Sequence, residues 1–249
     1  MKRLGLAFLL LASGLRAAPA AVLLAAATAA EMQPLLDRLA GPKTEQIAAW
    51  QFWTGTLDGR PVVLARTEGD PLNAVAATTL AIRRYQPRLV VTFGPARAHD
   101  PALRAGDVVV SGKFAAFDGL FSHPAPVGGG SAPLTWERLP HQLSAPGEKE
   151  IAAFTFPADA AALQGAKNLT HPPGRVVVGV LGSANQVNRE ADRIAWLHRE
   201  WGTSCEDGES AHIAGCAQLL GVPVIGVRVI DGAPGDAAGL VRQLLEALP

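Results

Sequence analysis

The 249-residue chain has no excess of either charge, since its 22 Lys and Arg residues balance 22 Asp and Glu residues. It lacks the basic field that attracts nucleic acids, so we expect no nucleic-acid partner. Its six histidines are scattered, and neither an HExxH nor a CxxC pattern occurs, so we expect no metal site. No P-loop occurs, and no GxGxxG motif follows a predicted strand. We therefore expect an activity that uses neither a metal nor an organic cofactor.

Cysteine is scarce, because only Cys205 and Cys216 occur. An oxidising compartment would allow these two residues to form a disulfide. The first lies near a predicted strand end and the second two turns into the next predicted helix. That separation permits a bridge without requiring one, and we favour two buried thiols.

The only long apolar run near the start of the chain is too short to span a bilayer comfortably. Lys2 and Arg3 precede the apolar stretch 4–15, and small residues follow at 18–20. This order is typical of a secretory signal peptide, so we predict one over 1–20 and a mature domain over 21–249. An uncleaved anchor and a first strand are the alternatives. After cleavage we expect a periplasmic or secreted protein without stable membrane association.

The length suits one large α/β domain, and an apolar content of 49% is ample for its core. Apolar runs predict strands over 21–27, 50–57, 61–67, 88–93, 108–111, 175–181 and 222–230. Helical spacing predicts helices over 31–40, 73–85, 190–201, 209–220 and 237–248, with Asn73 as an N-cap. Asp58-Gly59 predicts a hairpin turn, and the segment 122–150, rich in Pro, Gly and Ser, predicts an irregular excursion. Alternating strands and helices favour a mixed, twisted sheet flanked by helices.

Three carboxylates follow or flank predicted strands, where α/β sheets bind ligands. Glu31 opens a helix and is either a partner of the helix dipole or a site residue. Glu209 opens another helix, and its carboxylate suits a ribose diol, because it can accept from two hydroxyls. Asp231 ends the last strand and is either a turn residue or a general acid.

Arg228 lies in the middle of the apolar strand VIGVRVI. A buried arginine needs an acidic partner, and Glu206, Glu209 and a ligand anion are the candidates. We favour a structural ion pair. The segment GESAH at 208–212 begins like a nucleophile elbow but lacks the closing glycine, so a serine hydrolase is disfavoured.

Three segments carry a family resemblance: ATAAEMQPLL at 27–36, EGDPLNAVAATTLAIRRYQPRLVVTFGPARAHDPALRAGDVVVS at 68–111 and GTSCEDGESAHIAGCAQLLGVPVIGVRVI at 202–230. They resemble the purine nucleoside phosphorylase/uridine phosphorylase superfamily, and within it the methylthioadenosine/S-adenosylhomocysteine nucleosidase branch. The resemblance implies the nucleoside phosphorylase-like fold over 21–249, a small-molecule nucleoside as ligand and a homodimer.

The resemblance also implies roles for individual residues. Glu31 matches the acid that positions the attacking water, Glu209 matches the residue that binds the ribose hydroxyls, and Asp231 lies near the general acid. The remaining matches are Gly208 beside the ribose, Gly94, Pro95 and Arg97 in the loop that contacts water or phosphate, and Ser183, Ala184 and Asn185 in the base-pocket loop.

The chain departs from the family pattern at several of these positions. Gly208 replaces a methionine between two acids, and Pro95 and Arg97 replace a hydroxyl residue and a glycine. Asp231 occupies the position of a serine, and Gly232 occupies that of the general acid. Three functions therefore stay open: a nucleosidase, a nucleoside- or base-binding protein of the same fold, and a phosphorylase with Arg97 as phosphate ligand.

Overall fold

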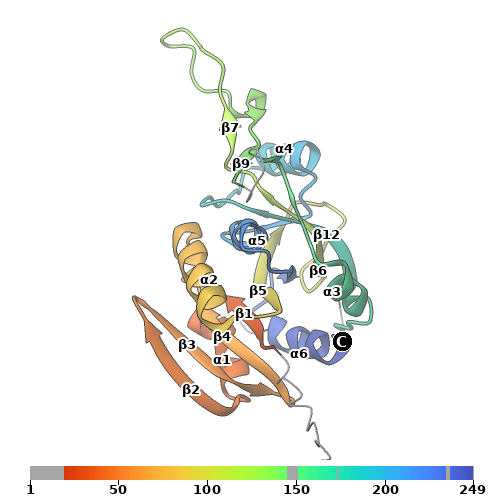
Figure 1. Cartoon of the computed structure of the whole chain (residues 1–249). Coiled ribbons are helices and arrows are strands. Elements are labelled where there is room, and N and C mark those ends of the chain that lie inside the picture. The colour runs from red at the N-terminus through yellow and green to blue at the C-terminus, as the bar shows by residue number, and fades with distance from the viewer. Residues whose placement is uncertain (1–19, 145–150, 173, 234–235, 249) are drawn as a thin grey trace, which may run out of the picture.

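The computed structural model describes residues 20–144, 151–172, 174–233 and 236–248 (Figure 1). Apart from Ala20, the predicted signal peptide lies outside the described residues. None of the helices in these four ranges has the length and apolarity needed to cross a membrane.

One mixed sheet forms the centre of the molecule, as predicted. Its central strand β1 pairs in parallel with β4 and β5, and β5 pairs in parallel with β14. The strands are β1 (Val22–Ala26), β2 (Ala40–Ile47), β3 (Trp50–Leu57), β4 (Arg60–Arg66), β5 (Leu89–Ala98), β6 (Val108–Ala116), β11 (Phe156–Pro157), β12 (Val176–Ser183), β13 (Cys205–Asp207) and β14 (Val224–Ile230).

Five of these strands close into a ring, which the sequence did not predict. β5 pairs with β14, β14 with β6, β6 with β12, β12 with β13, and β13 again with β5. The long strands β5 and β6 make this possible, because a strand that twists along its length can meet different neighbours at its two ends. The ring brings the ends of β5, β12, β13 and β14 together.

Helices cover both faces of the sheet (Figure 1). One face packs against α1 (Ala29–Leu36), α3 (Ala160–Ala166) and α6 (Ala237–Ala247), and the other packs against α2 (Pro71–Tyr85) and α5 (Ser210–Leu219). The remaining helix, α4 (Ala191–Trp201), contributes Trp196, Leu197 and Trp201 to a separate apolar cluster. The helix α6 illustrates why these segments dock, because Leu240, Val241, Leu244 and Leu245 form one buried stripe along it.

Several element boundaries differ from the predictions, and the strand expected over 108–111 extends to Ala116. The helix expected over 31–40 ends at Leu36, because the chain continues from Ala40 as β2, which pairs with β3. The helix expected to start at Asn73 starts at Pro71, because the Asp70 side chain accepts a hydrogen bond from Leu72 N and caps the helix.

A further difference bears on the site. The strand expected over 88–93 continues to Ala98, because β13 and β14 both pair with its second half. Gly94, Pro95 and Arg97 therefore lie in a strand, and the loop expected there does not form. Gly94 permits the continuation with a φ of +148°.

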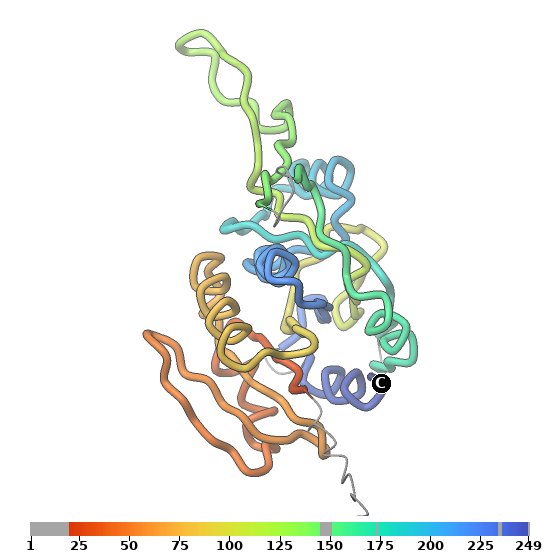
Figure 2. The backbone as a smooth tube through the Cα atoms, viewed as in Figure 1, coloured from red at the N-terminus to blue at the C-terminus, as the bar shows by residue number. Residues whose placement is uncertain are grey.

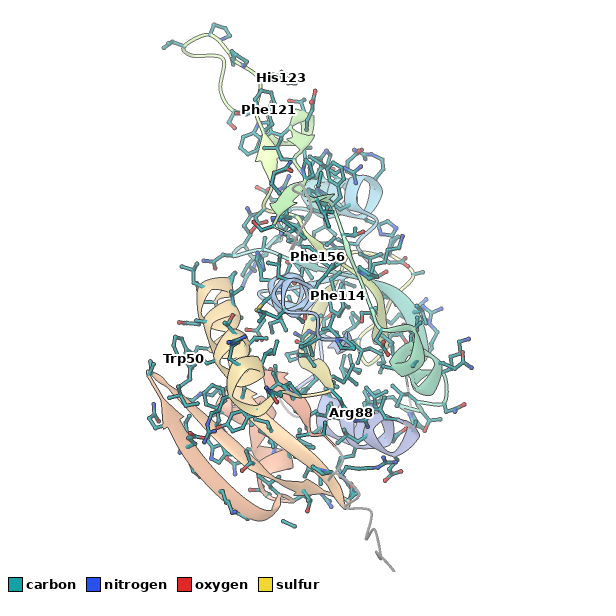
Figure 3. All side chains as sticks on the ribbon, viewed as in Figure 1. Trp50, Arg88, Phe114, Phe121, His123 and Phe156 are labelled. Atoms are coloured by element: carbon teal, nitrogen blue, oxygen red, sulfur yellow. The ribbon has the colours of Figure 1, made fainter. Side chains whose placement is uncertain are left out.

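Within the excursion expected over 122–150, the described residues 122–144 belong to an arm that extends away from the sheet (Figure 2). Its ordered pieces are small: β7 (Leu120–Phe121) pairs with β8 (Glu137–Arg138), and β9 (His141–Leu143) pairs with β10 (Ile151–Ala153). The 3₁₀ turn η1 (Pro133–Thr135) lies between β7 and β8 in the chain. In Figure 3, Phe121 and His123 lie on this arm, whereas Phe114 and Phe156 lie in the body beside α5.

Both cysteines are free and buried, which confirms the preference for two thiols. Cys205 lies in β13 and Cys216 lies in α5, where its Sγ is 3.2 Å from Thr79 Oγ1.

Candidate active site

A pocket of about 640 Å³ lies where β1, β5, β12, β13 and β14 end. Most of the predicted site residues border this pocket, although they come from five separate segments. The structure places the following predicted residues on its wall: Glu31, Pro95, Arg97, Ala184, Asn185, Gly208, Glu209 and Asp231. The pocket wall also includes Glu206, Asp207, Arg228, Gln186 and Val187.

Glu31 is held in the first turn of α1 by reciprocal hydrogen bonds with Thr28. Its backbone N donates to Thr28 Oγ1 over 3.2 Å, and that hydroxyl is 3.0 Å from Glu31 Oε1. The backbone N of Ala27 donates to Oε2 over 3.1 Å. The side chain is only 5% exposed, so this capping arrangement fixes a carboxylate at the edge of the pocket.

Gly94 lies immediately behind this carboxylate. A Cβ atom on Gly94 would be 2.6 Å from Glu31 Oε2 and 3.1 Å from Arg228 Nη1. Only a residue without a side chain allows these two groups to flank the same point. Gly94 is therefore needed for the approach of the acid and the cation, although it does not itself line the pocket.

Arg228 and Asp207 form a buried ion pair, with Arg228 Nε 2.7 Å from Asp207 Oδ2. The expectation of a structural ion pair is met, but the expected partners Glu206 and Glu209 are both wrong. Asp207 is the partner because it is the last residue of β13, and both β13 and β14 pair with the second half of β5.

The remaining nitrogens of Arg228 have separate tasks. Nη2 donates to Thr92 Oγ1 over 2.9 Å and to Ser210 Oγ. Nη1 lies on the Gly94 side, near Glu31, and Arg228 borders the pocket. The guanidinium is thus anchored through two nitrogens and presents the third toward the site.

Asp207 is saturated with donors. Its Oδ1 accepts from Ser183 Oγ and from the backbone N atoms of Glu209 and Ser210, over 2.7–2.8 Å. Burial alone would raise the pKa of Asp207, but the Arg228 charge and these hydrogen bonds outweigh it and lower the pKa. Asp207 is therefore an ionised anchor with little capacity left for a ligand. Ser183 belongs to this anchor and does not line the pocket.

Glu209 has the opposite character. It lies at the N-cap of α5 and is 1% exposed, and its Oε2 accepts from Thr67 Oγ1 over 2.7 Å. Its Oε1 is buried and has no hydrogen-bond partner within the described ranges. Burial raises the pKa of Glu209 to about 7, against the lowering effects of Thr67 and Arg228. A buried oxygen without a donor is a vacant acceptor site for a ligand hydroxyl.

Glu206 also borders the pocket, but other residues occupy its oxygens. Asn188 donates to it through its backbone N over 3.0 Å and through Nδ2 over 2.6 Å, and His99 Nε2 is 3.1 Å from Oε2. Burial would raise the pKa of Glu206, but these neighbours lower it. Glu206 therefore supports the wall and is not free to bind a ligand.

The pocket wall has two parts that differ in chemistry. Glu31 and Arg228 flank Gly94, and Glu209 lies close enough to both to feel their charges. Arg97 and Asp231 also border a second hollow, which none of these three residues lines. Asp231 is exposed, has a φ of +47°, and donates from its backbone N to Ala96 O over 2.8 Å. Asn185 Nδ2 is 3.2 Å from Asp70 Oδ2, which ties the segment 184–187 to the start of α2.

Gly208 contributes space to the pocket wall. A Cβ on Gly208 would be 2.6 Å from the carbonyl oxygen of Gly69, a residue with a φ of +72°. The glycine lets the turn at Gly69 approach β13, so any larger residue at this position would displace that turn.

Residue-level reasoning from the sequence missed several residues that shape the site. Thr67 sets the environment of Glu209, and Asp207 holds Arg228. The acidic residues Glu206, Asp207 and Glu209 were visible in the sequence, but which acid faces Arg228 depends on strand pairing. Thr67 has no sequence signal, because its contact with Glu209 spans 142 positions.

Comparison with known proteins gives one family and a consistent set of relatives. The model of the family described as the phosphorylase superfamily matches residues 19–246. A 5'-methylthioadenosine/S-adenosylhomocysteine nucleosidase of Tolumonas auensis is 27% identical over 220 residues, which cover 87% of this chain and 88% of the relative.

Solved structures give the same picture of the fold. The nucleosidase of that name from Colwellia psychrerythraea 34H, in complex with adenine, has a TM-score of 0.75 at 20% identity and covers 93% of this chain and 96% of its own. The Neisseria meningitidis nucleosidase, in complex with methylthio-immucillin-A, also has a TM-score of 0.75 at 20% identity, with 92% and 100% covered. At this identity the likeness establishes the fold.

Proposed function

The chain belongs to the phosphorylase superfamily, and on that premise we propose that it hydrolyses the N-glycosidic bond of purine nucleosides. The observation that carries this proposal is the Oε1 atom of Glu209, which is buried at the pocket wall and has no hydrogen-bond partner among the described residues. A ribose hydroxyl would supply the missing donor. The nucleosidase names of the relatives make methylthioadenosine and S-adenosylhomocysteine the first substrates to test.

The residues around Glu209 suit the hydrolytic step. Glu31 and Arg228 both border the pocket beside Glu209. In the proposed reaction, a water that Glu31 holds in the pocket adds its oxygen to C1', and its proton passes to the Glu31 carboxylate. The C1'–N9 bond breaks, and its electron pair leaves with the base. Arg228 fixes the orientation of the Glu31 carboxylate through its charge and does not take up a proton.

The test is the release of free base from methylthioadenosine, S-adenosylhomocysteine and inosine, followed by chromatography with and without phosphate. Glu31→Gln should lower the release by roughly 10²- to 10⁴-fold, because the amide cannot accept the proton of the water. Glu137→Gln on the exposed arm is the matched control and should keep the full rate. Full activity in Glu31→Gln would refute the mechanism, and release that requires phosphate would make the protein a phosphorylase.

A second candidate is a nucleoside- or base-binding protein without turnover. Gly232 occupies the position of the family's general acid, and the neighbouring Asp231 is exposed. This candidate predicts that nucleosides raise the melting temperature while no base is released even at enzyme concentrations near those of the substrate.

We propose export and self-association as further properties. The order of charge, apolar run and small residues over 1–20 supports a cleaved signal peptide. A cell fractionation with mass spectrometry of the mature N-terminus tests this, and retention of Met1 in the cytosolic fraction would contradict it. For a homodimer, the support is the exposed apolar side chains of the arm, among them Phe121, Val127 and Leu139. Light scattering of the purified protein tests the dimer.

A further inference from the structure

One arginine on the pocket wall, Arg97, lies on the part of the wall that also borders a second hollow. Arg97 lies near the end of β5, and the hollow has a volume of about 440 Å³. Asp231 borders the same two spaces, because its backbone N pairs with Ala96 O over 2.8 Å. These two residues therefore form the wall shared by the pocket and the hollow.

The guanidinium of Arg97 is not used by the protein. Arg97 is opposite Glu206 in the β5–β13 pairing, but the Glu206 oxygens are already bound by Asn188 and approached by His99. Within the ranges that the structure describes, no ion pair or side-chain hydrogen bond involves Arg97 or Asp231. An exposed arginine at a pocket wall without a protein partner has all five N–H donors available to a ligand.

The proposed function places the base of a nucleoside near Arg97. The ribose and the attacking water then bind at Glu209 and Glu31, and the base extends along the wall toward Arg97 and Asp231, which border the second hollow as Glu31 and Glu209 do not. The side-chain amides of Asn185 and Gln186 can donate or accept hydrogen bonds and so fit any base edge. Arg97 can only donate, which makes it the residue that selects among bases.

We propose that Arg97 selects purine nucleosides that carry an oxygen at C6, by donating from its guanidinium to O6 and N7 of the base. This inference rests on the proposed function and names the substrate class within it. O6 and N7 are two adjacent acceptors, and a bidentate arginine is the side chain that matches this pair. Adenine has an amino group at C6, whose N–H bonds would point at the N–H bonds of the guanidinium.

The same contact assists departure of the base. When the C1'–N9 bond breaks, its electron pair delocalises over the purine ring, including N7 and O6. Two donors from a cation stabilise this charge where it develops. The base then takes a proton from solvent, while the water has given its hydroxyl to C1' and its proton to Glu31. In this arrangement a general acid at position 232, where the chain has glycine, is not needed.

The test compares matched substrates that differ only at C6: inosine with adenosine, and 5'-methylthioinosine with 5'-methylthioadenosine. We expect the kcat/KM of the native protein to favour the 6-oxo member of each pair by roughly 10- to 100-fold. Arg97→Met roughly keeps the length of the side chain and removes its donors. The preference should therefore disappear, because the kcat/KM for the 6-oxo nucleosides falls while that for the 6-amino nucleosides does not. Arg97→Lys keeps the charge without the planar fork and should restore only a small part of the preference.

Arg189→Met is the control, because Arg189 borders the hollow but not the main pocket. It should change both members of a pair by the same factor. Equal or faster hydrolysis of the adenine nucleoside by the native protein would overturn the inference and leave the proposed function intact. A preference for the 6-oxo nucleosides that Arg97→Met leaves unchanged would also overturn the inference.

A second measurement keeps the inference testable if no nucleoside is hydrolysed, which would refute the proposed function. The melting temperature is then measured with hypoxanthine and with adenine. A larger shift with hypoxanthine that Arg97→Met abolishes would support the role of Arg97 in base selection. Equal shifts, or none with either base, would overturn it.

Discussion

Arg228 and Asp207 form an ion pair of 2.7 Å in which both side chains are less than a tenth exposed. Asp207 also accepts hydrogen bonds from the start of α5, so the pair joins β13, β14 and the helix that carries Glu209. The Arg228 cation beside Glu31 and the Glu209 carboxylate thus depend on the same anchor. The ion pair therefore stabilises the fold and also positions Arg228 and Glu209.

Loss of one partner of this pair should destabilise the protein strongly. Asp207→Asn leaves the Arg228 charge buried without its counter-ion, and we expect the free energy of unfolding to fall by about 3–5 kcal/mol. Urea denaturation measures the change. The control is Asp58→Asn, which breaks the more exposed pair with Arg242 and should lower the stability by less than about 1 kcal/mol. Similar losses in the two variants would contradict the anchoring role of Asp207.

The pH dependence should follow Glu209. Its ionised form would bind the proposed ribose diol more strongly, because a carboxylate accepts charge-assisted hydrogen bonds through both oxygens and the protonated form turns one oxygen into a donor. Burial raises the pKa of Glu209 to about 7. We therefore expect kcat/KM to rise with pH through a midpoint near 7 and Glu209→Gln to lose both the rise and most of the activity. Thr67→Val is the informative variant, because the Thr67 hydrogen bond lowers this pKa. Its midpoint should move to higher pH, and an unchanged or lower midpoint would refute the assignment.

The same raised pKa makes a prediction about stability. The native state holds the Glu209 proton more tightly than the unfolded state, whose pKa is 4.5. The contribution of this proton is complete below pH 4.5 and is lost as the pH rises through about 7. Over this window we expect Glu209→Gln to lose less stability than the native protein, as followed by urea midpoints at several pH values. Parallel pH profiles of the two proteins would contradict this expectation.

Gly94 offers a test of geometry at the ribose end. Gly94→Ala places a Cβ 2.6 Å from Glu31 Oε2 and should displace that carboxylate, so we expect kcat to fall by roughly 10²-fold. Gly59→Ala is the control. The φ of Gly59 is +78°, so an alanine there is also strained, but its Cβ would meet open space in the hairpin turn. This control should lose some stability and keep its kcat. Equal kcat in the two variants would show that the close fit at Gly94 has no catalytic consequence.

Features that depend on local sequence were predicted, and features that depend on contacts between distant residues were not. The hairpin at Asp58-Gly59 and the apolar strands followed from local patterns, because backbone preference and side-chain alternation are local properties. The start of α2 at Asp70 was missed by a few residues, since Asp70 and Asn73 are both good caps and only the fold selects one.

The site divides in the same way. Glu31 and Glu209 were identified from their places beside strands and from a family resemblance, and the structure brings both to one pocket. The Asp207 partner of Arg228 was not identified, because it depends on the closed five-strand ring, whose pairings join distant parts of the chain. Whether Asp231 acts as a general acid stays a prediction.

Asp231→Asn separates the two ways in which the base can leave. The asparagine fits the φ of +47°, since Asn adopts the left-handed region readily, so the fold should be kept. If Asp231 were the general acid, base release would fall by roughly 10²- to 10⁴-fold. We expect a fall of less than about tenfold on a 6-oxopurine nucleoside, because the Arg97 guanidinium stabilises the departing base without an acid. The measurement is base release in a single turnover by Asp231→Asn and by Arg97→Met. A larger loss in Asp231→Asn than in Arg97→Met would show that Asp231 is the residue that assists departure of the base.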